Sequence, residues 1–355
     1  MKPHLHNNIG RLTLGILLLI LTPLIVRCAS EPAKTYNKDG KTYGVTQGNW
    51  RGKWSNYYER GLSFAAGEYW TEAASDFNQA IKLRSTDQLR ARTYGLHFID
   101  DYFPHRELGF TYLNMKNFDD AIRELEDSNS MQPSARARHY LDQARAEKLQ
   151  MTNEDKQAPT VKIDAPLQGA ATNAFEVTIN GHATDDFYVG AITVNGEPVQ
   201  IDLSAPELPF EHKVKVARGA NDITVSATDL TGKTTEKNVS IYVDRQGPSV
   251  GLDSPSREDI IEGQIVRVEG VLVDETGIES LTVAGKTITL SGANAIEKTF
   301  IANIPADPTS DSLIFVARDT AGNTTRGEIQ FSRPTTVFNH FNSQPLATSL
   351  CSSRI

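Results

Sequence analysis

The sequence predicts a multidomain fold that is α-helical toward the N-terminus and all-β toward the C-terminus. Between residues 57 and 149, large apolar residues and small residues recur at helical spacing in two successive blocks. After Pro159 apolar and polar residues alternate, which is typical of half-buried strands. The alternating block then repeats 89 residues later (248 − 159). These observations predict helical hairpins followed by two tandem β-sandwiches.

The two helical blocks share a pattern of large residues around a glycine. The first block contains Tyr57, Gly61, Phe64, Trp70, Ala73, Phe77 and Ala80. The second contains Leu108, Gly109, Tyr112, Phe118, Ala121, Leu125 and Pro133. The pattern resembles the tetratricopeptide repeat, a pair of antiparallel helices that stacks on its neighbours because one pair cannot bury its apolar face alone. A closing helix is expected after Ser134.

The segment between the two blocks is longer than an ordinary repeat allows. Gly61 and Gly109 are 48 residues apart (109 − 61), whereas the usual period is about 34 residues. The extra residues fall between positions 85 and 103, which are rich in Arg, Tyr, His and Asp. We expect this insertion to extend the second helix or to add a short one. Specific binding and a solvated loop are both open interpretations of its composition.

Tetratricopeptide grooves bind peptides through side chains of their inner helices, so the resemblance implies a protein partner. Polar residues at such positions and in the insertion are candidate partner contacts: Asn78, Lys82, Arg90, Arg92, His97, Asn114 and Arg123. Residues 49–58 also contain Trp50, Trp54, Tyr57 and Tyr58. This aromatic cluster packs onto the first hairpin or, alternatively, forms a carbohydrate platform.

The two β blocks share an Ala-x-Asp-x-x-Gly turn, at residues 227–232 and 317–322. They resemble bacterial immunoglobulin-like domains, especially the type found beside the catalytic domain of glucodextranase-like glycosidases. Four alternating residues are expected to face the cores: Val177, Ile179, Val266 and Val268. The paired acids Asp185 and Asp229, and Asp274 and Asp319, have the composition of calcium ligands, but no dense calcium loop is present. Capping of their own turns is the expected role.

The N-terminus has the organisation of an export signal. Lys2 and Arg11 precede an uncharged run over residues 12–26, which is shorter than the about 20 residues of a membrane span. The run ends at Arg27-Cys28 and resembles a bacterial lipoprotein signal, which implies a lipid on Cys28. Arg27 departs from that pattern, where Gly, Ala or Ser is usual. Ordinary secretion and an uncleaved anchor therefore remain alternatives.

The expected segment boundaries follow from these features. They are residues 1–30 for the export segment, 31–48 for a flexible tether, 49–150 for the helical domain, 159–244 and 248–333 for the sandwiches, and 334–355 for a disordered tail.

Charge and motif content restrict the function. Residues 151–333 carry 15 basic and 27 acidic residues, a balance of −12 (15 − 27), which argues against nucleic acid as a partner. The chain has two cysteines, Cys28 and Cys351, near opposite ends. No nucleophile elbow, phosphate loop or zinc motif occurs in the sequence. We therefore expect no enzyme activity, no catalytic residue, no metal site and no cofactor.

The domain order resembles bacterial envelope lipoproteins in which tetratricopeptide units and immunoglobulin-like domains precede a further domain. The function predicted is a non-enzymatic scaffold that binds an envelope protein, with the β domains as spacers or adhesive modules. The expected location is the outer membrane, facing the periplasm, through the lipid on Cys28; secretion or inner-membrane anchoring are alternatives. A carbohydrate-binding accessory protein with a glycan partner, or a truncated multidomain enzyme, are the competing functions.

Overall fold

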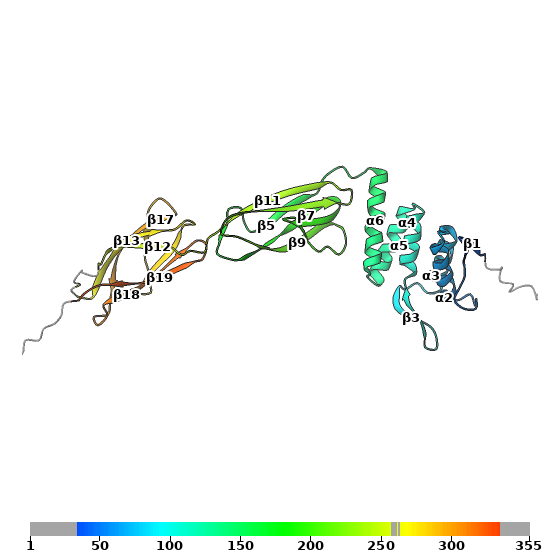
Figure 1. The fold of residues 1–355 in the computed structure, drawn as a ribbon, viewed down its shortest axis with the longest axis horizontal. Coiled ribbons are helices and arrows are strands. Elements are labelled where there is room, and N and C mark those ends of the chain that lie inside the picture. Colours follow the sequence, from blue (N-terminus) through cyan, green and yellow to red (C-terminus); the bar gives the residue numbers. More distant parts are fainter. Residues whose placement is uncertain (1–33, 257–260, 262, 334–355) are drawn as a thin grey trace, which may run out of the picture. The chain divides into compact units, whose positions relative to one another are not determined.

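The computed structural model of the chain describes residues 34–256, 261 and 263–333. They divide into two compact units, one ending at residue 156 and one beginning at residue 157. Among the described residues, the α-helices lie in the first unit and the second unit is built from strands, as predicted (Figure 1). The export segment with Cys28 and the tail from residue 334 lie outside the described residues.

Five helices form the core of the first unit: α2 (Trp54–Ala66), α3 (Trp70–Leu83), α4 (Pro104–Asn114), α5 (Phe118–Met131) and α6 (Ala135–Thr152). Helices α2 and α3 form one antiparallel pair, and α4 and α5 form another. A Cβ atom at Gly61 would lie 2.8 Å from the Phe77 ring, and one at Gly109 would lie 2.6 Å from Leu125 Cγ. The two glycines therefore occur where paired helices approach closely, as the sequence pattern predicts.

The N-terminal tether is partly structured, contrary to expectation. Strands β1 (Tyr36–Lys38) and β2 (Lys41–Tyr43) form an antiparallel hairpin. The Tyr36 ring stacks on Tyr69 with 4.3 Å between centroids, and Lys34 Nζ lies 3.2 Å from Glu72 Oε1. The prediction of a flexible tether over residues 31–48 is wrong for its described part, because these aromatic rings pack against the first helical pair.

The insertion between the helical pairs is also different from its prediction. It forms the hairpin β3 (Gln88–Tyr94) and β4 (His97–Tyr102), with no added or extended helix. Gly95 at φ +50° allows the tight reversal. Ala91 and Tyr102 are both fully buried, so the hairpin is anchored by its own apolar residues.

The first β-sandwich contains the strands β5 (Thr160–Ala165), β6 (Ala171–Thr172), β7 (Glu176–Val194), β8 (Glu197–Pro198), β9 (Ala205–Lys215), β10 (Gly219–Asp229) and β11 (Thr234–Val243). Strand β7 is 19 residues long. It pairs with β5 and β9 over its first part and with β10 over its second. One long strand therefore links the two faces of the domain.

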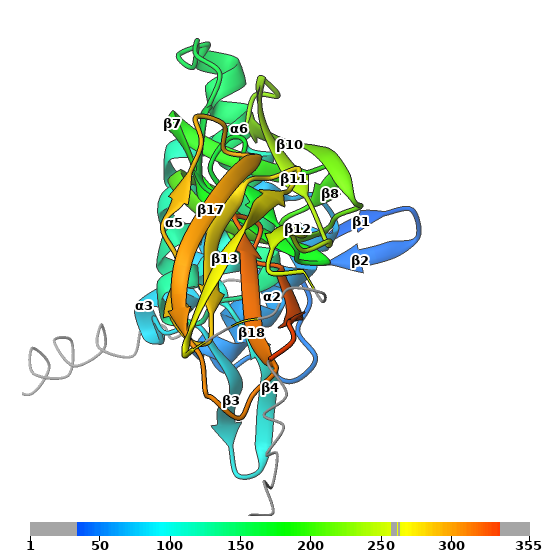
Figure 2. The ribbon, with the colours of Figure 1, turned by 90° about the vertical axis from the view of Figure 1, so that its left-hand side faces the viewer.

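The second β-sandwich contains β12 (Ser249–Ser254), β13 (Ile265–Val273), β14 (Ile278–Val283), β15 (Lys286–Thr287), β16 (Leu290–Ser291), β17 (Glu297–Pro305), β18 (Ser312–Asp319) and β19 (Thr324–Gln330). Two four-stranded sheets have the orders β12-β13-β17-β16 and β15-β14-β18-β19. Figure 2 shows β12, β13 and β17 side by side. The strand equivalent to β7 is thus divided into β13 and β14.

The residues predicted to face the β cores do so. Ile179, Val266 and Val268 are fully buried, and Val177 is partly buried against the same core as Ile179. Their alternation with exposed residues explains why the sequence pattern locates them correctly.

Candidate functional site

The base of the β3–β4 hairpin is fixed to the helices by buried tyrosines. Tyr58 Oη donates a hydrogen bond to Asp101 O at 2.7 Å and accepts one from Phe103 N at 3.2 Å. Tyr102 Oη donates to Arg84 O at 2.7 Å. Burial raises the pKa of both phenols, so they remain protonated donors at neutral pH. The hairpin therefore has a fixed orientation on the helical unit.

The tip of the hairpin is exposed and partly apolar. Leu96 is 91% exposed and Tyr94 is 64% exposed. The Tyr94 ring stacks on His97 with 5.1 Å between centroids, and His97 Nδ1 lies 2.7 Å from Thr93 Oγ1. The tip is therefore an ordered projection with an aliphatic side chain at its end.

A pocket of about 380 Å³, here called the hairpin pocket, lies between this tip, the loop before α2 and the first turn of α2. Its lining residues are Gln47, Gly48, Asn49, Arg51, Lys53, Ser55, Asn56, Glu59, Thr93, Tyr94 and His97. The Asn56 carboxamide holds the loop in place, because its Oδ1 accepts hydrogen bonds from Arg51 N at 2.9 Å and Lys53 N at 3.4 Å. The insertion and the aromatic segment thus contribute to one concave, polar surface.

Three of the candidate partner contacts lie on the hairpin. Of these three, Arg90, Arg92 and His97, it is His97 that lines the hairpin pocket. Arg90 lies over the Phe98 ring at 5.2 Å, and Arg92 Nε donates to Gly95 O at 2.6 Å. Both arginines therefore make contacts within the hairpin as well as facing solvent.

The other four candidate residues are distributed over three helices. Asn78 Nδ2 donates to Ala74 O and to Tyr112 Oη, and Asn114 Nδ2 donates to Phe110 O. Arg123 forms ion pairs with two carboxylates of its own helix, and Lys82 is exposed on α3. The structure does not bring these four residues into one site with His97.

The tryptophans of the aromatic cluster have contacts on their faces. The Arg60 guanidinium lies 4.0 Å from the Trp50 ring centroid, and that of Arg84 lies 4.6 Å from the Trp54 centroid. Trp54 also packs against Tyr102 at 4.5 Å. These contacts favour the packing interpretation of the cluster over a carbohydrate platform.

A buried ionic network joins the hairpin to α4 and was not foreseen from the sequence. Arg106 is 4% exposed and Glu107 is 3% exposed. Arg106 Nη2 lies 2.6 Å from Asp101 Oδ2 and its Nε lies 2.9 Å from Glu107 Oε1, while Arg136 also contacts Glu107. Burial raises the pKa of Glu107, and the two guanidinium groups act against that shift.

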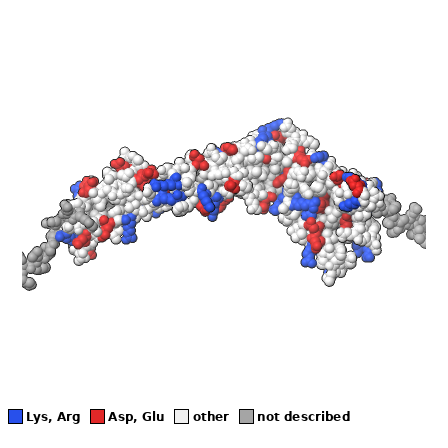
Figure 3. Space-filling model, viewed as in Figure 1, with Lys and Arg blue, Asp and Glu red and all other residues white. Residues whose placement is uncertain are grey.

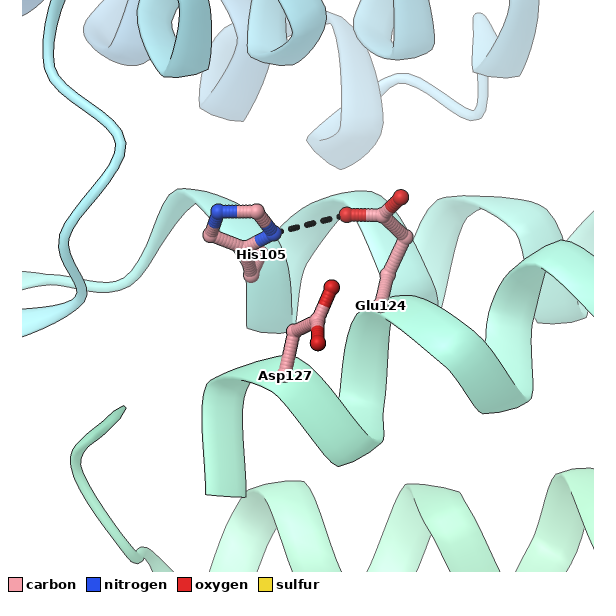
Figure 4. Close-up of side chains that lie close together, drawn as sticks. All are labelled: His105, Glu124 and Asp127. Carbon is pink, nitrogen blue, oxygen red and sulfur yellow. Dashed lines mark hydrogen bonds and ion pairs between the residues drawn. The ribbon is translucent and has the colours of Figure 1, made fainter. Parts of the chain in front are cut away.

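A second buried group lies between α4 and α5 (Figure 4). His105 Nδ1 lies 2.7 Å from Glu124 Oε2, and the exposed Asp127 completes a set whose ligand-type atoms lie within 4.8 Å of one another. Burial opposes protonation of His105, but the Glu124 contact and nearby Asp87 raise its pKa overall. Arg123 contacts the second oxygen of Glu124 at 3.1 Å. His105 and Arg123 therefore both contact the Glu124 carboxylate, which is typical of a charge-balanced ion-pair cluster and not of a metal centre.

The paired aspartates of the β unit cap turns, as expected. Asp185 Oδ1 accepts from the backbone N–H groups of Phe187 and Tyr188. Asp229, Asp274 and Asp319 accept in the same way from residues two to four positions later.

A further group of oxygens lies within the β unit. Carboxylate oxygens of Asp244, Asp274 and Asp319 lie within 4.8 Å of one another, and all three residues are buried. The contacts of Asp244 include a hydrogen bond from Gln246 N at 3.0 Å, which is again a backbone cap. This spacing would admit a cation, but each carboxylate already has a structural role.

The surface has mixed charge. On the face shown in Figure 3, lysine and arginine side chains are interspersed with aspartate and glutamate. Among the described residues, no helix has the length and hydropathy needed to cross a membrane.

Comparison with known proteins places the first β-sandwich in a known class. Residues 159–245 match the protein family described as glucodextranase, domain B. The match supports the immunoglobulin-like assignment, which the repeat at 89 residues (248 − 159) extends to the second sandwich.

Two curated relatives are proteinases. Bacillopeptidase F of Bacillus subtilis is 28% identical over 115 residues, which are 32% of this chain and 8% of that protein. The PII-type proteinase of Lactococcus lactis subsp. cremoris is 30% identical over 111 residues, which are 29% of this chain and 6% of the proteinase. The chain therefore spans less than a tenth of either relative.

Two bacterial proteins are among the solved structures to which the chain is similar. The fibronectin(III)-like modules of Clostridium thermocellum CbhA are 20% identical, with 49% of this chain and 95% of that chain covered and a TM-score of 0.32. SGBP-B of the Bacteroides ovatus mixed-linkage glucan utilization locus is 15% identical, with 50% and 48% covered and a TM-score of 0.18.

Proposed function

We propose that the chain is a non-enzymatic adaptor of the bacterial cell envelope that binds a protein partner through its helical unit. The observation that carries this proposal is the β3–β4 hairpin. Its base is held by Tyr58 and Tyr102, while Leu96 at its tip is 91% exposed. An apolar side chain on an ordered projection loses little conformational entropy on binding, so it is suited to enter a pocket of a partner.

The remaining parts of the proposal concern the framework. The close helix contacts at Gly61 and Gly109 support assignment of the two helical pairs to the tetratricopeptide type. A lipid on Cys28 would attach the N-terminal end to the outer membrane on its periplasmic side. The two β-sandwiches would act as spacers or as a second adhesive surface.

A carbohydrate-binding accessory role is the second candidate. The similarity to glucodextranase domain B favours it. The cations over the faces of Trp50 and Trp54 count against stacking of sugar rings there. A glycan array with the full chain and its Trp50→Ala variant distinguishes the two functions, because retention that depends on Trp50 would favour carbohydrate.

The adaptor proposal is tested by crosslinking in cells and affinity isolation of the full chain, wild type against Leu96→Ser. This substitution leaves the core intact, whereas deletion of residues 85–103 would remove the buried Ala91 and Tyr102. Leu167→Ser is the matched control, since Leu167 is 76% exposed in the β unit.

We expect one envelope protein to be recovered with wild type and with Leu167→Ser, and its recovery to fall about tenfold with Leu96→Ser. Equal recovery with all three, or no specific protein with any, would overturn the adaptor proposal.

A further inference from the structure

We infer that the hairpin pocket binds a carboxylate group, carried by an acidic peptide segment of the partner. This inference rests on the proposed function and specifies the chemistry of the partner. The pocket has a volume of about 380 Å³, enough for one acidic side chain and part of its backbone, and it opens beside the apolar tip of the hairpin.

The first turn of α2 supplies unsatisfied donors. The backbone N–H groups of Asn56 and Tyr57 bond to Lys53 O. Within the described part of the chain, those of Trp54 and Ser55 have no acceptor. The helix has 13 residues and no acidic residue in its first turn. The positive end of its dipole therefore has no acidic residue within its own first turn.

Two cations line the same pocket. Arg51 and Lys53 are exposed, and neither forms an ion pair with any described residue. Glu59 is the acidic residue of the lining, and its Oε2 accepts a hydrogen bond from Gln47 N at 3.2 Å. The lining therefore has a formal charge of +1 (two cations less one anion, with His97 neutral), on a chain of net charge −8.

Ser55 is the independent observation that points to a ligand. The residue is only 8% exposed and lines the pocket. Its hydroxyl has no hydrogen-bond partner among residues 34–256, 261 and 263–333. The hydroxyl oxygen of Ser55 is not among the buried side-chain atoms that lack a partner, so it opens into the pocket, where a ligand can accept its hydrogen bond. A carboxylate oxygen at the start of α2 would accept from this hydroxyl and from the free N–H groups together.

The surroundings favour a peptide over an anionic glycan. Tyr94 lines the pocket and leads into Leu96, so a residue next to the bound acid would lie against apolar surface. The faces of Trp50 and Trp54, which a sugar would use, are covered by Arg60 and Arg84. An acidic residue flanked by aliphatic residues matches both parts of this surface.

The test is fluorescence anisotropy with the full chain and two pools of labelled octapeptides that end in an amide. In one pool the central residue is Asp or Glu, flanked by leucines, and in the other it is Asn or Gln. We expect the acidic pool to bind about tenfold more tightly, since a charge-assisted hydrogen bond contributes about that factor. Arg51→Gln and Ser55→Ala should each remove most of this preference.

Lys286→Gln is the control, because it removes the same charge from an exposed site on β15 of the β unit, outside the pocket. Equal binding of the two pools, or a preference that survives both pocket substitutions, would show the inference to be wrong. So would binding of a sulfated glucan oligosaccharide in place of the acidic peptides. If the cellular partner is lost with Leu96→Ser but retained with Arg51→Gln, this inference fails while the adaptor function stands.

Discussion

The helical unit and the β unit bury different kinds of side chain. In the helical unit, charged residues lie inside the helix packing, and His105, Arg106, Glu107 and Glu124 are each no more than 8% exposed. Both units have apolar buried clusters, but the buried charged residues of the β unit are aspartates, which include those that cap turns. Helix packing in this protein therefore combines apolar contacts with buried charges of both signs, whereas the sandwiches combine apolar contacts with buried carboxylates.

This difference has a thermodynamic consequence. A buried ion pair adds little net stability, but loss of one partner leaves an uncompensated charge and is strongly destabilising. Removal of buried hydrocarbon instead costs the transfer free energy plus the free energy of the cavity left behind. The two units should therefore respond to different substitutions and to different solution conditions.

The largest effect is expected for Arg106→Met. Glu107 and Asp101 would lose their common partner, and the free energy of unfolding of the helical unit should fall by about 4 kcal/mol. Urea denaturation followed by helical circular dichroism at 222 nm measures this change. Arg267→Met removes an exposed pair with Glu269 and should cost less than about 1 kcal/mol. Similar losses for the two variants would contradict the comparison.

An intermediate effect is expected for Ile179→Ala in the first sandwich. Ile179 is fully buried in an apolar cluster, so the substitution should cost about 3 kcal/mol. Val268→Ala, at the equivalent position of the second sandwich, removes fewer atoms and should cost about 2 kcal/mol. Differential scanning calorimetry should show the loss in the β transition. A shift of the helical transition by either substitution would contradict this expectation.

The smallest effect is expected from pH. The pKa of His105 is raised from 6.5, so the stability that its charge contributes is complete below 6.5 and is lost as pH rises through the raised value. The pKa of Glu124 is lowered from 4.5, so its contribution is complete above 4.5 and is lost as pH falls through the lowered value. The pair should stabilise the helical unit most between pH 4.5 and 6.5.

Chemical denaturation of the helical unit across this pH range measures the effect. His105→Gln should remove the decrease above pH 6.5. An unchanged pH profile in this variant would assign the dependence to another group.

The sequence predicts the regular parts of both units because their packing is periodic. Gly61 and Gly109 lie where the paired helices approach each other closely. Ile179 and Val268 occupy buried positions in the alternating pattern of their strands. The hairpin of residues 88–102 was predicted as a helix. Its composition has no long alternation, and its anchoring depends on Tyr58, which lies 43 residues away from its acceptor Asp101 along the chain.

The N-terminal end of α4 shows what tertiary structure alone decides. Phe103 at the N-cap supplies no side-chain cap, but Asp87 accepts from the backbone N–H groups of His105 and Arg106, 18 and 19 residues later. Local spacing does not reveal such a cap. The hairpin pocket is similar, because the 47–59 segment and the 93–97 turn meet only after the hairpin folds onto α2. Thus the sequence by itself determined the helical and β-sandwich architecture, since hydrophobic periodicity is local. The tertiary structure decided the buried ion pairs and the pocket, since charges and cavities depend on residues that are distant along the chain.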